Sequence, residues 1–304
     1  MSSAFAEPFD CLPDAPLQRL SLAWLERAGV EVAVLRLDLI DPLISGNKWF
    51  KLLEHLRVAR SVGAGGIISL GGAHSNHLHA LAAAGRRFGF ATAGLLRGHP
   101  QDTPTVRDLQ AFGMQLHWIG YGGYRARHQP DFWQPWLERY PGWHAVPEGG
   151  GGELGTQGCA LIVEQARSQL SALGWADYDA MWLAVGTGTT LAGLVMAERG
   201  AHKVYGAVAV PGDHGVEGNV EALVPSSHCA YELIDASRGG FAKVDDVLLA
   251  FMAAAEEESG LPLEPVYTGK ALLALHERVQ AGAFARGSRV IFVHTGGLQG
   301  YRLR

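Results

Sequence analysis

The residue best suited to chemistry is a lysine that follows a glycine-containing turn. Residues 45–54 read SGNKWFKLLE, and apolar side chains recur after the lysine at the 3.6-residue period of a helix. Gly46 allows a tight turn, and Asn47 is expected to cap the helix. Lys48 then lies in the first helical turn, where the helix dipole favours the neutral amine that can attack a carbonyl carbon. Lys51 is expected to point away from Lys48, toward solvent or a neighbouring loop.

A second polar segment, LGGAHSNH at residues 70–77, lies between a predicted strand and a predicted helix. Its backbone N–H groups, together with the side chains of Ser75 and Asn76, suit a substrate carboxylate. An ordinary serine cap would explain Ser75 but not the neighbouring glycines. The histidines do not predict a metal site, because His77 and His79 project about 200° apart on a helix. The segment also lacks an H-E-x-x-H pattern.

A third segment, VGTGTTLAG at residues 185–193, again joins an apolar strand to a helix. Its glycines let successive N–H groups converge, and its threonine hydroxyls add donors, as in a phosphate-binding loop. No Gly-Lys-Ser/Thr follows, and Leu191 occupies the last glycine position of G-x-G-x-x-G, so a nucleotide is disfavoured. A structural turn remains the alternative. The residues expected to bind phosphate are Gly186, Thr187, Gly188, Thr189 and Thr190.

The C-terminal third adds two further candidates. Tyr267 begins a predicted helix and could donate or accept a proton. Thr295 follows a buried strand, and its hydroxyl can hydrogen-bond an aromatic ring nitrogen without protonating it. Each also has a plain structural explanation, as a packed ring and a turn residue. A reactive lysine, a carboxylate site, a phosphate loop and a partner for a ring nitrogen together match one cofactor, pyridoxal 5'-phosphate.

The elements expected to position these residues alternate between short apolar strands and longer helices, which predicts βαβ units and parallel sheets. The predicted strands are residues 30–39, 66–70, 91–96, 115–119, 180–185, 203–210 and 289–294. The predicted helices are residues 75–88, 103–112, 156–170, 190–199, 245–259 and 271–281. The glycines at 149–152 suggest a hinge or a crossing between two α/β domains, with a ligand cleft between them. The aromatic segment at residues 121–143 fits neither pattern.

Composition narrows the remaining function classes. The chain has 304 residues, 48% of them hydrophobic, with a net charge of −5. No basic block points to nucleic acid, and no apolar run approaches the ~20 residues of a membrane helix. The three isolated cysteines, Cys11, Cys159 and Cys229, predict neither disulfides nor a zinc site. Residues Met1 to Asp10 lack the apolar core of a signal peptide, so we expect a cytoplasmic protein.

Four motifs resemble those of the 1-aminocyclopropane-1-carboxylate deaminase/D-cysteine desulfhydrase family, within the tryptophan-synthase-β-like (fold type II) enzymes. Residues 46–52 (GNKWFKL) resemble its G-G-N-K-x-R-K-L motif, and residues 74–77 (HSNH) its Q-S-N-H/Q motif. Residues 267–270 (YTGK) resemble Y-E/T-G-K, and residues 294–297 (HTGG) resemble H-T/L-G-G. The resemblance follows the family's order over nearly the whole chain.

The resemblance implies two three-layer α/β/α domains with the active site in the cleft between them. Residues 1–50 and 148–304 would form a large cofactor-binding domain, with residues 51–147 inserted as a small domain. Lys48 would form the Schiff base with pyridoxal phosphate, and the chain would form a homodimer. The other implied site residues are Ser75, Asn76, His77 and Tyr267 for the substrate and Asn76, residues 186–190, Thr268 and Thr295 for the cofactor.

The departures from the family pattern bear on the reaction. Trp49 and Phe50 replace the polar pair after the lysine, and His74 replaces glutamine. Thr268 stands where the deaminase branch has a glutamate on the ring nitrogen. A neutral partner makes a weaker electron sink, which favours elimination of a good leaving group over opening of a cyclopropane ring. We therefore expect α,β-elimination on a small amino acid such as D-cysteine. The alternatives are 1-aminocyclopropane-1-carboxylate deaminase and another activity of the fold, such as a dehydratase or racemase.

Overall fold

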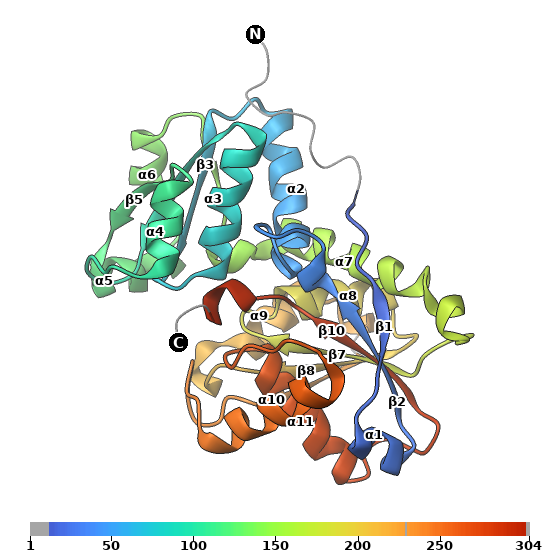
Figure 1. The fold of residues 1–304 in the computed structure, drawn as a ribbon. Helices are drawn as coiled ribbons and strands as arrows, with labels where there is room; N and C mark the ends of the chain where they lie inside the picture. Colours follow the sequence, from blue (N-terminus) through green and yellow to red (C-terminus); the bar gives the residue numbers. More distant parts are fainter. Residues whose placement is uncertain (1–11, 229, 302–304) are drawn as a thin grey trace.

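The larger of two sheets has six strands and contains the first and last strands of the described chain. The computed structural model describes residues 12–228 and 230–301, so the N-terminal stretch 1–10, Cys11 and Cys229 lie outside the described residues. The strand order is β1–β2–β10–β7–β8–β9, with only β1 antiparallel to its neighbour (Figure 1). These strands are β1 (Leu17–Leu20), β2 (Glu31–Arg36), β7 (Ala180–Val185), β8 (Lys203–Val208), β9 (Tyr231–Asp235) and β10 (Arg289–His294).

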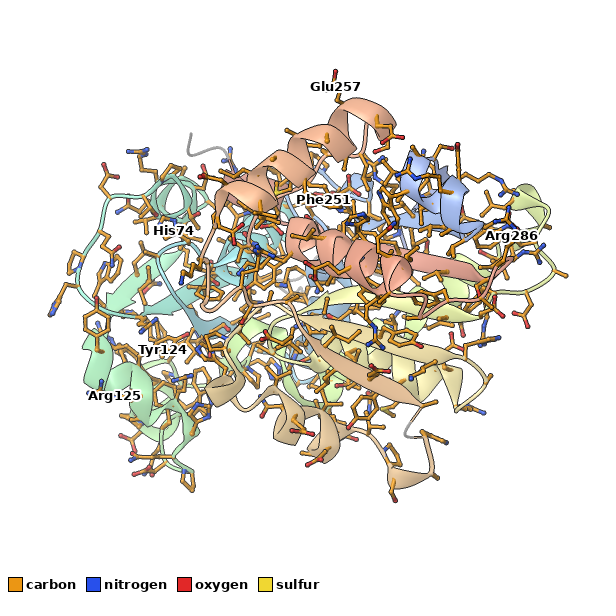
Figure 2. All side chains as sticks on the ribbon, turned by 90° about the horizontal axis from the view of Figure 1, so that it is seen from below. His74, Tyr124, Arg125, Phe251, Glu257 and Arg286 are labelled. Atoms are coloured by element: carbon orange, nitrogen blue, oxygen red, sulfur yellow. The ribbon has the colours of Figure 1, made fainter. Side chains whose placement is uncertain are left out.

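Helices cover both faces of this sheet because alternate strand residues are apolar on each side. One buried cluster joins one face to α7 (Gly152–Arg167), α8 (Thr189–Glu198) and α9 (Val216–Leu223). A second cluster joins the other face to α1 (Ala23–Ala28), α10 (Asp246–Ser259) and α11 (Thr268–Gln280). Figure 2 shows α10, with Phe251 and Glu257, along one side of the large domain, where Phe251 stacks on His276 of α11.

The smaller sheet has four parallel strands in the order β5–β4–β3–β6. Its strands are β3 (Gly66–Gly71), β4 (Ala91–Leu96), β5 (Gln115–Trp118) and β6 (His144–Ala145). Its helices are α2 (Asn47–Ser61), α3 (Asn76–Phe88), α4 (Pro104–Ala111), α5 (Gly120–Arg125) and α6 (Gln134–Arg139). The aromatic segment that fitted no sequence pattern covers one sheet face, burying Tyr124, Phe132 and Tyr140 against β3 and β4. The expected pair of α/β domains is confirmed.

The sequence missed the short elements at the margins of the large sheet, namely β1, β9, α1 and α9. The domain boundary proposed between residues 50 and 51 falls inside α2. This helix contacts both domains: Trp49 packs edge-on against Phe88 of α3, with ring centroids 6.3 Å apart. On its other side, a Cβ added to Gly158 of α7 would come within 2.0 Å of the Phe50 carbonyl oxygen.

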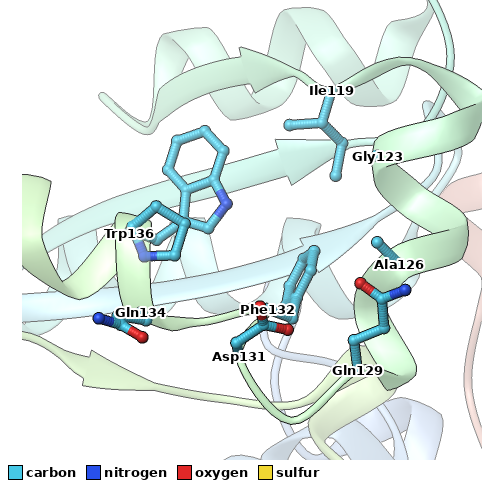
Figure 3. A pocket seen from close by; sticks show the side chains of 9 residues that line it. Ile119, Gly123, Ala126, Gln129, Asp131, Phe132, Gln134 and Trp136 are labelled. Atoms are coloured by element: carbon cyan, nitrogen blue, oxygen red, sulfur yellow. The ribbon is translucent and has the colours of Figure 1, made fainter.

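The small domain has a surface hollow of its own, away from the polar segments. A hollow beside α5 and α6 in the small domain (Figure 3) contains none of the site residues expected from sequence. No helix in the described part of the chain is long and apolar enough to cross a membrane. The polar segments at residues 70–77 and 185–193, and Thr295, lie at the carboxyl ends of β3, β7 and β10, which is where parallel sheets bind ligands.

Candidate active site

The start of α2 is held against the loop that follows β10. Gly46 has a φ of 71°, and a Cβ there would lie 2.1 Å from the Thr295 carbonyl oxygen. The next residue, Asn47, donates its backbone N–H to that same oxygen at 3.2 Å. The expectation that Asn47 caps the helix is wrong, because its side chain donates to Thr190 Oγ1 at 2.9 Å. Asn47 therefore ties α2 to the glycine-threonine loop after β7.

Lys48 lies partly buried at this junction, and its Nζ donates to Asn47 Oδ1 at 2.9 Å. Burial, followed by the charge of Lys51, lowers the pKa of Lys48 to about 7. The expected direction of the shift is confirmed, but its main cause is burial and not the helix dipole. Near neutral pH a large fraction of Lys48 is therefore the nucleophilic free amine.

Lys51 was expected to reach solvent or a neighbouring loop, and the solvent alternative is wrong. Its side chain is 4% exposed, and its Nζ donates to Thr187 Oγ1 at 3.2 Å. Burial lowers its pKa. Neither Lys51 nor Lys48 forms an ion pair with any residue that the structure describes. The burial of Lys51 beside Lys48 could have been predicted from their spacing, because residues i and i+3 lie on the same face of a helix.

The loop after β7 forms the N-terminus of α8. Gly188, at a φ of 87°, is the N-cap residue, so no side chain blocks the end of the helix. The hydroxyls of Thr187 and Thr189 lie 3.3 Å apart, and Thr187 also accepts from Lys51. A helix N-terminus with converging hydroxyls and an unpaired ammonium is a site for an anion such as phosphate. Gly186 lies against the Tyr267 ring, because a Cβ added to Gly186 would come within 3.2 Å of a ring carbon.

His77 is buried beside the two lysines with one ring nitrogen unpartnered. The Ser69 hydroxyl donates to the Val146 carbonyl at 2.8 Å, so its oxygen must accept from His77 Nε2–H at 2.7 Å. This fixes the tautomer and leaves Nδ1 as a bare acceptor with no partner among the described residues. Burial, followed by the charges of Lys48 and Lys51, holds the pKa of His77 well below its usual value.

The start of α3 meets the C-terminal loop. Ser75 caps the helix by accepting the Leu78 N–H at 3.2 Å, and its own hydroxyl proton remains available. Asn76 Oδ1 accepts from Gln299 at 3.3 Å, and a Cβ on Gly297 would lie 3.2 Å from Asn76 Nδ2. Both side chains are partly exposed. His74, the neighbour that departs from the family motif, is exposed (Figure 2).

The two threonines expected near a ring nitrogen differ in their surroundings. Thr268 is fully buried, and its hydroxyl accepts the Glu264 N–H at 3.0 Å and lies 3.3 Å from Glu264 Oε1. It is therefore engaged in the turn that begins α11. The hydroxyl of Thr295 has no hydrogen-bond partner among the described residues. Of the two, only Thr295 is free to serve a ligand.

Glu264 was missed by the sequence reading. Its carboxylate accepts the backbone N–H groups of Val266, Tyr267 and Thr268 at 2.8, 2.7 and 2.6 Å. Burial raises its pKa, which these hydrogen bonds oppose. Each carboxylate oxygen already has a backbone donor, so the residue shapes the start of α11. The signal available was a glutamate just before a predicted helix start.

The two lysines and the helix start in the cleft suit a ligand that is anionic and that also reacts with an amine. Among the described residues, Lys48 and Lys51 form no ion pair, the start of α8 has no side-chain cap, and His77 Nδ1 has no partner. The family description "Pyridoxal-phosphate dependent enzyme" matches residues 13–296. The chain belongs to this family. It is a pyridoxal-phosphate-dependent enzyme. Within residues 12–228 and 230–301, no three or more metal-binding side chains form a cluster.

The relatives bear out the more specific resemblance. A candidate 1-aminocyclopropane-1-carboxylate deaminase of Pyrococcus abyssi is 27% identical, over 94% of this chain and 90% of its own. A bifunctional D-cysteine desulfhydrase/1-aminocyclopropane-1-carboxylate deaminase of Arabidopsis thaliana is 28% identical, over 94% of this chain and 76% of its own. A solved structure of an ACC deaminase homologue has a TM-score of 0.80 at 24% identity, covering 97% of this chain and 92% of its own. The fold type II architecture is confirmed.

Proposed function

We propose that the protein catalyses α,β-elimination on a small D-amino acid such as D-cysteine, with pyridoxal phosphate held by Lys48. D-Cysteine and water would give pyruvate, ammonia and hydrogen sulfide. The observation that carries the proposal is that Lys51 donates to Thr187 in the loop that begins α8, while Lys48 lies close enough for the Lys51 charge to lower its pKa. Neither lysine forms an ion pair with a described residue. This arrangement supports a reactive amine beside a phosphate site. The choice of D-cysteine follows from the family resemblance and is supported by the name of the Arabidopsis relative.

Lys48 and the residues at the start of α3 have different proposed roles in the reaction. When bound, the cofactor supplies an electron sink that weakens the bonds at the substrate Cα. The Lys48 amine, neutral in large part near pH 7, takes up the Cα proton as the β-substituent leaves. Ser75 and Asn76, at the start of α3, hold the substrate carboxylate with the helix N–H groups. His77 Nδ1 accepts a hydrogen bond in the same cleft.

Tyr267 is proposed as the acid that assists the leaving group. Burial, followed by the charges of Glu264 and Glu148, raises its pKa. The phenol therefore remains protonated at neutral pH and can donate to a departing thiolate. Its ring lies beside Gly186, so its hydroxyl is near the proposed phosphate loop.

Elimination is preferred over ring opening because the proposed partner of the ring nitrogen, the Thr295 hydroxyl, is neutral. Thr268 replaces the glutamate of the deaminase branch, and Thr295 offers a hydroxyl. The nearby carboxylate of Glu264 already binds three backbone N–H groups. A neutral partner stabilises carbanionic charge less than a carboxylate-paired pyridinium does. The second candidate is 1-aminocyclopropane-1-carboxylate deaminase, because that name is shared by several relatives.

A substrate panel tests the proposal. The purified enzyme would be offered D- and L-cysteine, D-serine and 1-aminocyclopropane-1-carboxylate, with 2-oxo acid, ammonia and sulfide measured. We expect equimolar sulfide and pyruvate from D-cysteine, at a kcat/KM at least about tenfold above the other substrates, equivalent to 1.4 kcal/mol. A higher kcat/KM for the cyclopropane substrate would replace the proposal with its alternative. Lys48→Ala should abolish turnover and the cofactor's absorption near ~410–420 nm.

We also propose the domain division at residues 50/51 and 147/148, a homodimer and a cytoplasmic location. The sequence and the family resemblance support these three. Size-exclusion chromatography with light scattering would test the dimer.

A further inference from the structure

The ammonium group of Lys270 lies in a cage of backbone carbonyls. The side chain is 1% exposed, and its Nζ donates to the carbonyl oxygens of Ser237, Gly240 and Ala209 at 2.8, 3.1 and 3.4 Å. All three of its protons can therefore be used. No carboxylate contacts it within the described residues. A buried charge without an ion pair is costly unless local dipoles satisfy it, so the cage offsets that cost.

The three carbonyls come from two segments at the carboxyl edge of the large sheet. Ala209 follows β8, and its own N–H donates to the Val185 carbonyl at 2.9 Å, next to the glycine-threonine loop. Ser237 and Gly240 belong to the loop at residues 236–243, which follows β9. Lys270 itself lies on α11, one turn after Tyr267. The ammonium thus links the phosphate loop, the 236–243 loop and the start of α11.

The 236–243 loop has a backbone that needs support. Arg238 and Ala242 have φ values of 55° and 54°, which side-chain-bearing residues seldom adopt. The loop carries Phe241, whose side chain is 50% exposed and whose ring lies edge-on to Tyr267 at 6.3 Å between centroids. The unusual backbone of the 236–243 loop therefore determines where Phe241 lies relative to Tyr267.

We propose that Lys270 is a positioning residue that acts as a built-in monovalent cation, organising the 236–243 loop and holding Phe241 against Tyr267. A ring of carbonyl oxygens is how proteins replace the water around potassium, and an ammonium group satisfies the same oxygens. Two consequences follow. The wild-type protein needs no potassium or ammonium for this loop, and removal of the side chain leaves a cage that a small cation can refill. The effect of Phe241 on substrate binding rests on the proposed function, whereas the effect of Lys270 on the geometry of the 236–243 loop does not.

Lys270→Ala and Lys270→Met separate this role from simple packing. Alanine leaves the cage empty, whereas methionine fills the space without the charge. Trypsin cleavage after Lys243, an exposed residue of the loop, reports loop order without any turnover. In tetramethylammonium chloride, both variants should be cleaved roughly tenfold faster than wild type, the ratio that corresponds to losing about 1.4 kcal/mol of charge-assisted hydrogen bonding. Ammonium or methylammonium chloride at equal ionic strength should restore protection and thermal stability to Lys270→Ala alone.

Three results would overturn the inference. They are wild-type resistance to trypsin in Lys270→Ala, equal responses of both variants to ammonium, and stabilisation of the wild-type protein by potassium beyond that by tetramethylammonium. The last measurement needs no variant, so it applies even if both substitutions prevent folding. In the rescued Lys270→Ala enzyme, KM for the amino-acid substrate should recover with loop protection. If the substrate panel fails while cation rescue succeeds, only the proposed reaction is wrong.

Discussion

Lys51→Met tests whether the second lysine of α2 binds the cofactor phosphate. Methionine keeps an unbranched side chain of similar length and removes the charge. A charge-assisted hydrogen bond contributes about 1.5–3 kcal/mol, so its loss should weaken pyridoxal phosphate binding by about 10- to 100-fold. Pyridoxal lacks the phosphate, and its affinity should be unchanged. The difference between the two ligands isolates the phosphate contact.

The assay is a titration of the cofactor-free protein with each aldehyde, followed by the absorption of the lysine-bound cofactor. Lys243→Met, at an exposed position, is the matched control and should bind both ligands as wild type does. Cofactor-free Lys51→Met should also melt at a higher temperature, because it no longer buries an unpaired ammonium. Equal weakening of pyridoxal and pyridoxal phosphate would refute the assignment, since it would indicate general damage to the cleft.

The same variant changes the titration of Lys48. In the wild-type protein, burial and the neighbouring charge of Lys51 depress the Lys48 pKa to about 7. Removing that like charge makes the ammonium form less unfavourable, so the Lys48 pKa should rise and the neutral amine should appear at higher pH. The rate of acylation of Lys48 in the cofactor-free protein, measured against pH by mass spectrometry, gives the midpoint. A downward shift would contradict the electrostatic argument.

Four further substitutions test the residues that support the site. Gly46→Ala places a methyl group on the Thr295 carbonyl and should cost at least about 2 kcal/mol in urea unfolding, from backbone strain and displacement; stability equal to wild type would count against the close crossing. Thr295→Val should lower kcat with little change in melting temperature, whereas Thr268→Val should lower the melting temperature first; the reverse pattern would exchange their roles. Ser69→Ala should cost about 1–3 kcal/mol by leaving His77 Nε2–H unpaired, and nitrogen NMR should detect a second imidazole tautomer; an unchanged tautomer would contradict the fixed one.

The parallel strands and the glycine-threonine loop could be predicted from sequence because their signals are local. A run such as residues 180–185 is apolar throughout, as expected for a strand covered on both faces. The glycines at its end then mark the turn where the next helix begins. The short edge strands β1 and β9 were missed because each has partly exposed or exposed residues and no long apolar run. Local patterns specify the centre of a sheet better than its edges.

The roles of individual polar side chains could not be predicted in the same way. Asn47 fits a capping pattern, but its partner Thr190 is 143 residues away along the chain. Thr268 fits a motif position, but Glu264 engages its hydroxyl through the local turn. Lys51 is of a residue type usually found on the surface, and it is buried because the turn at residues 148–150 and the glycine-threonine loop lie against it. Tertiary contacts decide these cases.

The two lysines of α2 show how one helix can supply both an amine and an anion site. Burial lowers the pKa of both, neither forms an ion pair with a described residue, and the charge of Lys51 further disfavours the ammonium form of Lys48. Lys48 relieves this by losing its proton near pH 7. Lys51 lies beside the Thr187 hydroxyl and the start of α8, where an anion would let it keep its charge. A ligand that carries a phosphate and an aldehyde satisfies both lysines together, and therefore stabilises the cleft while it is bound.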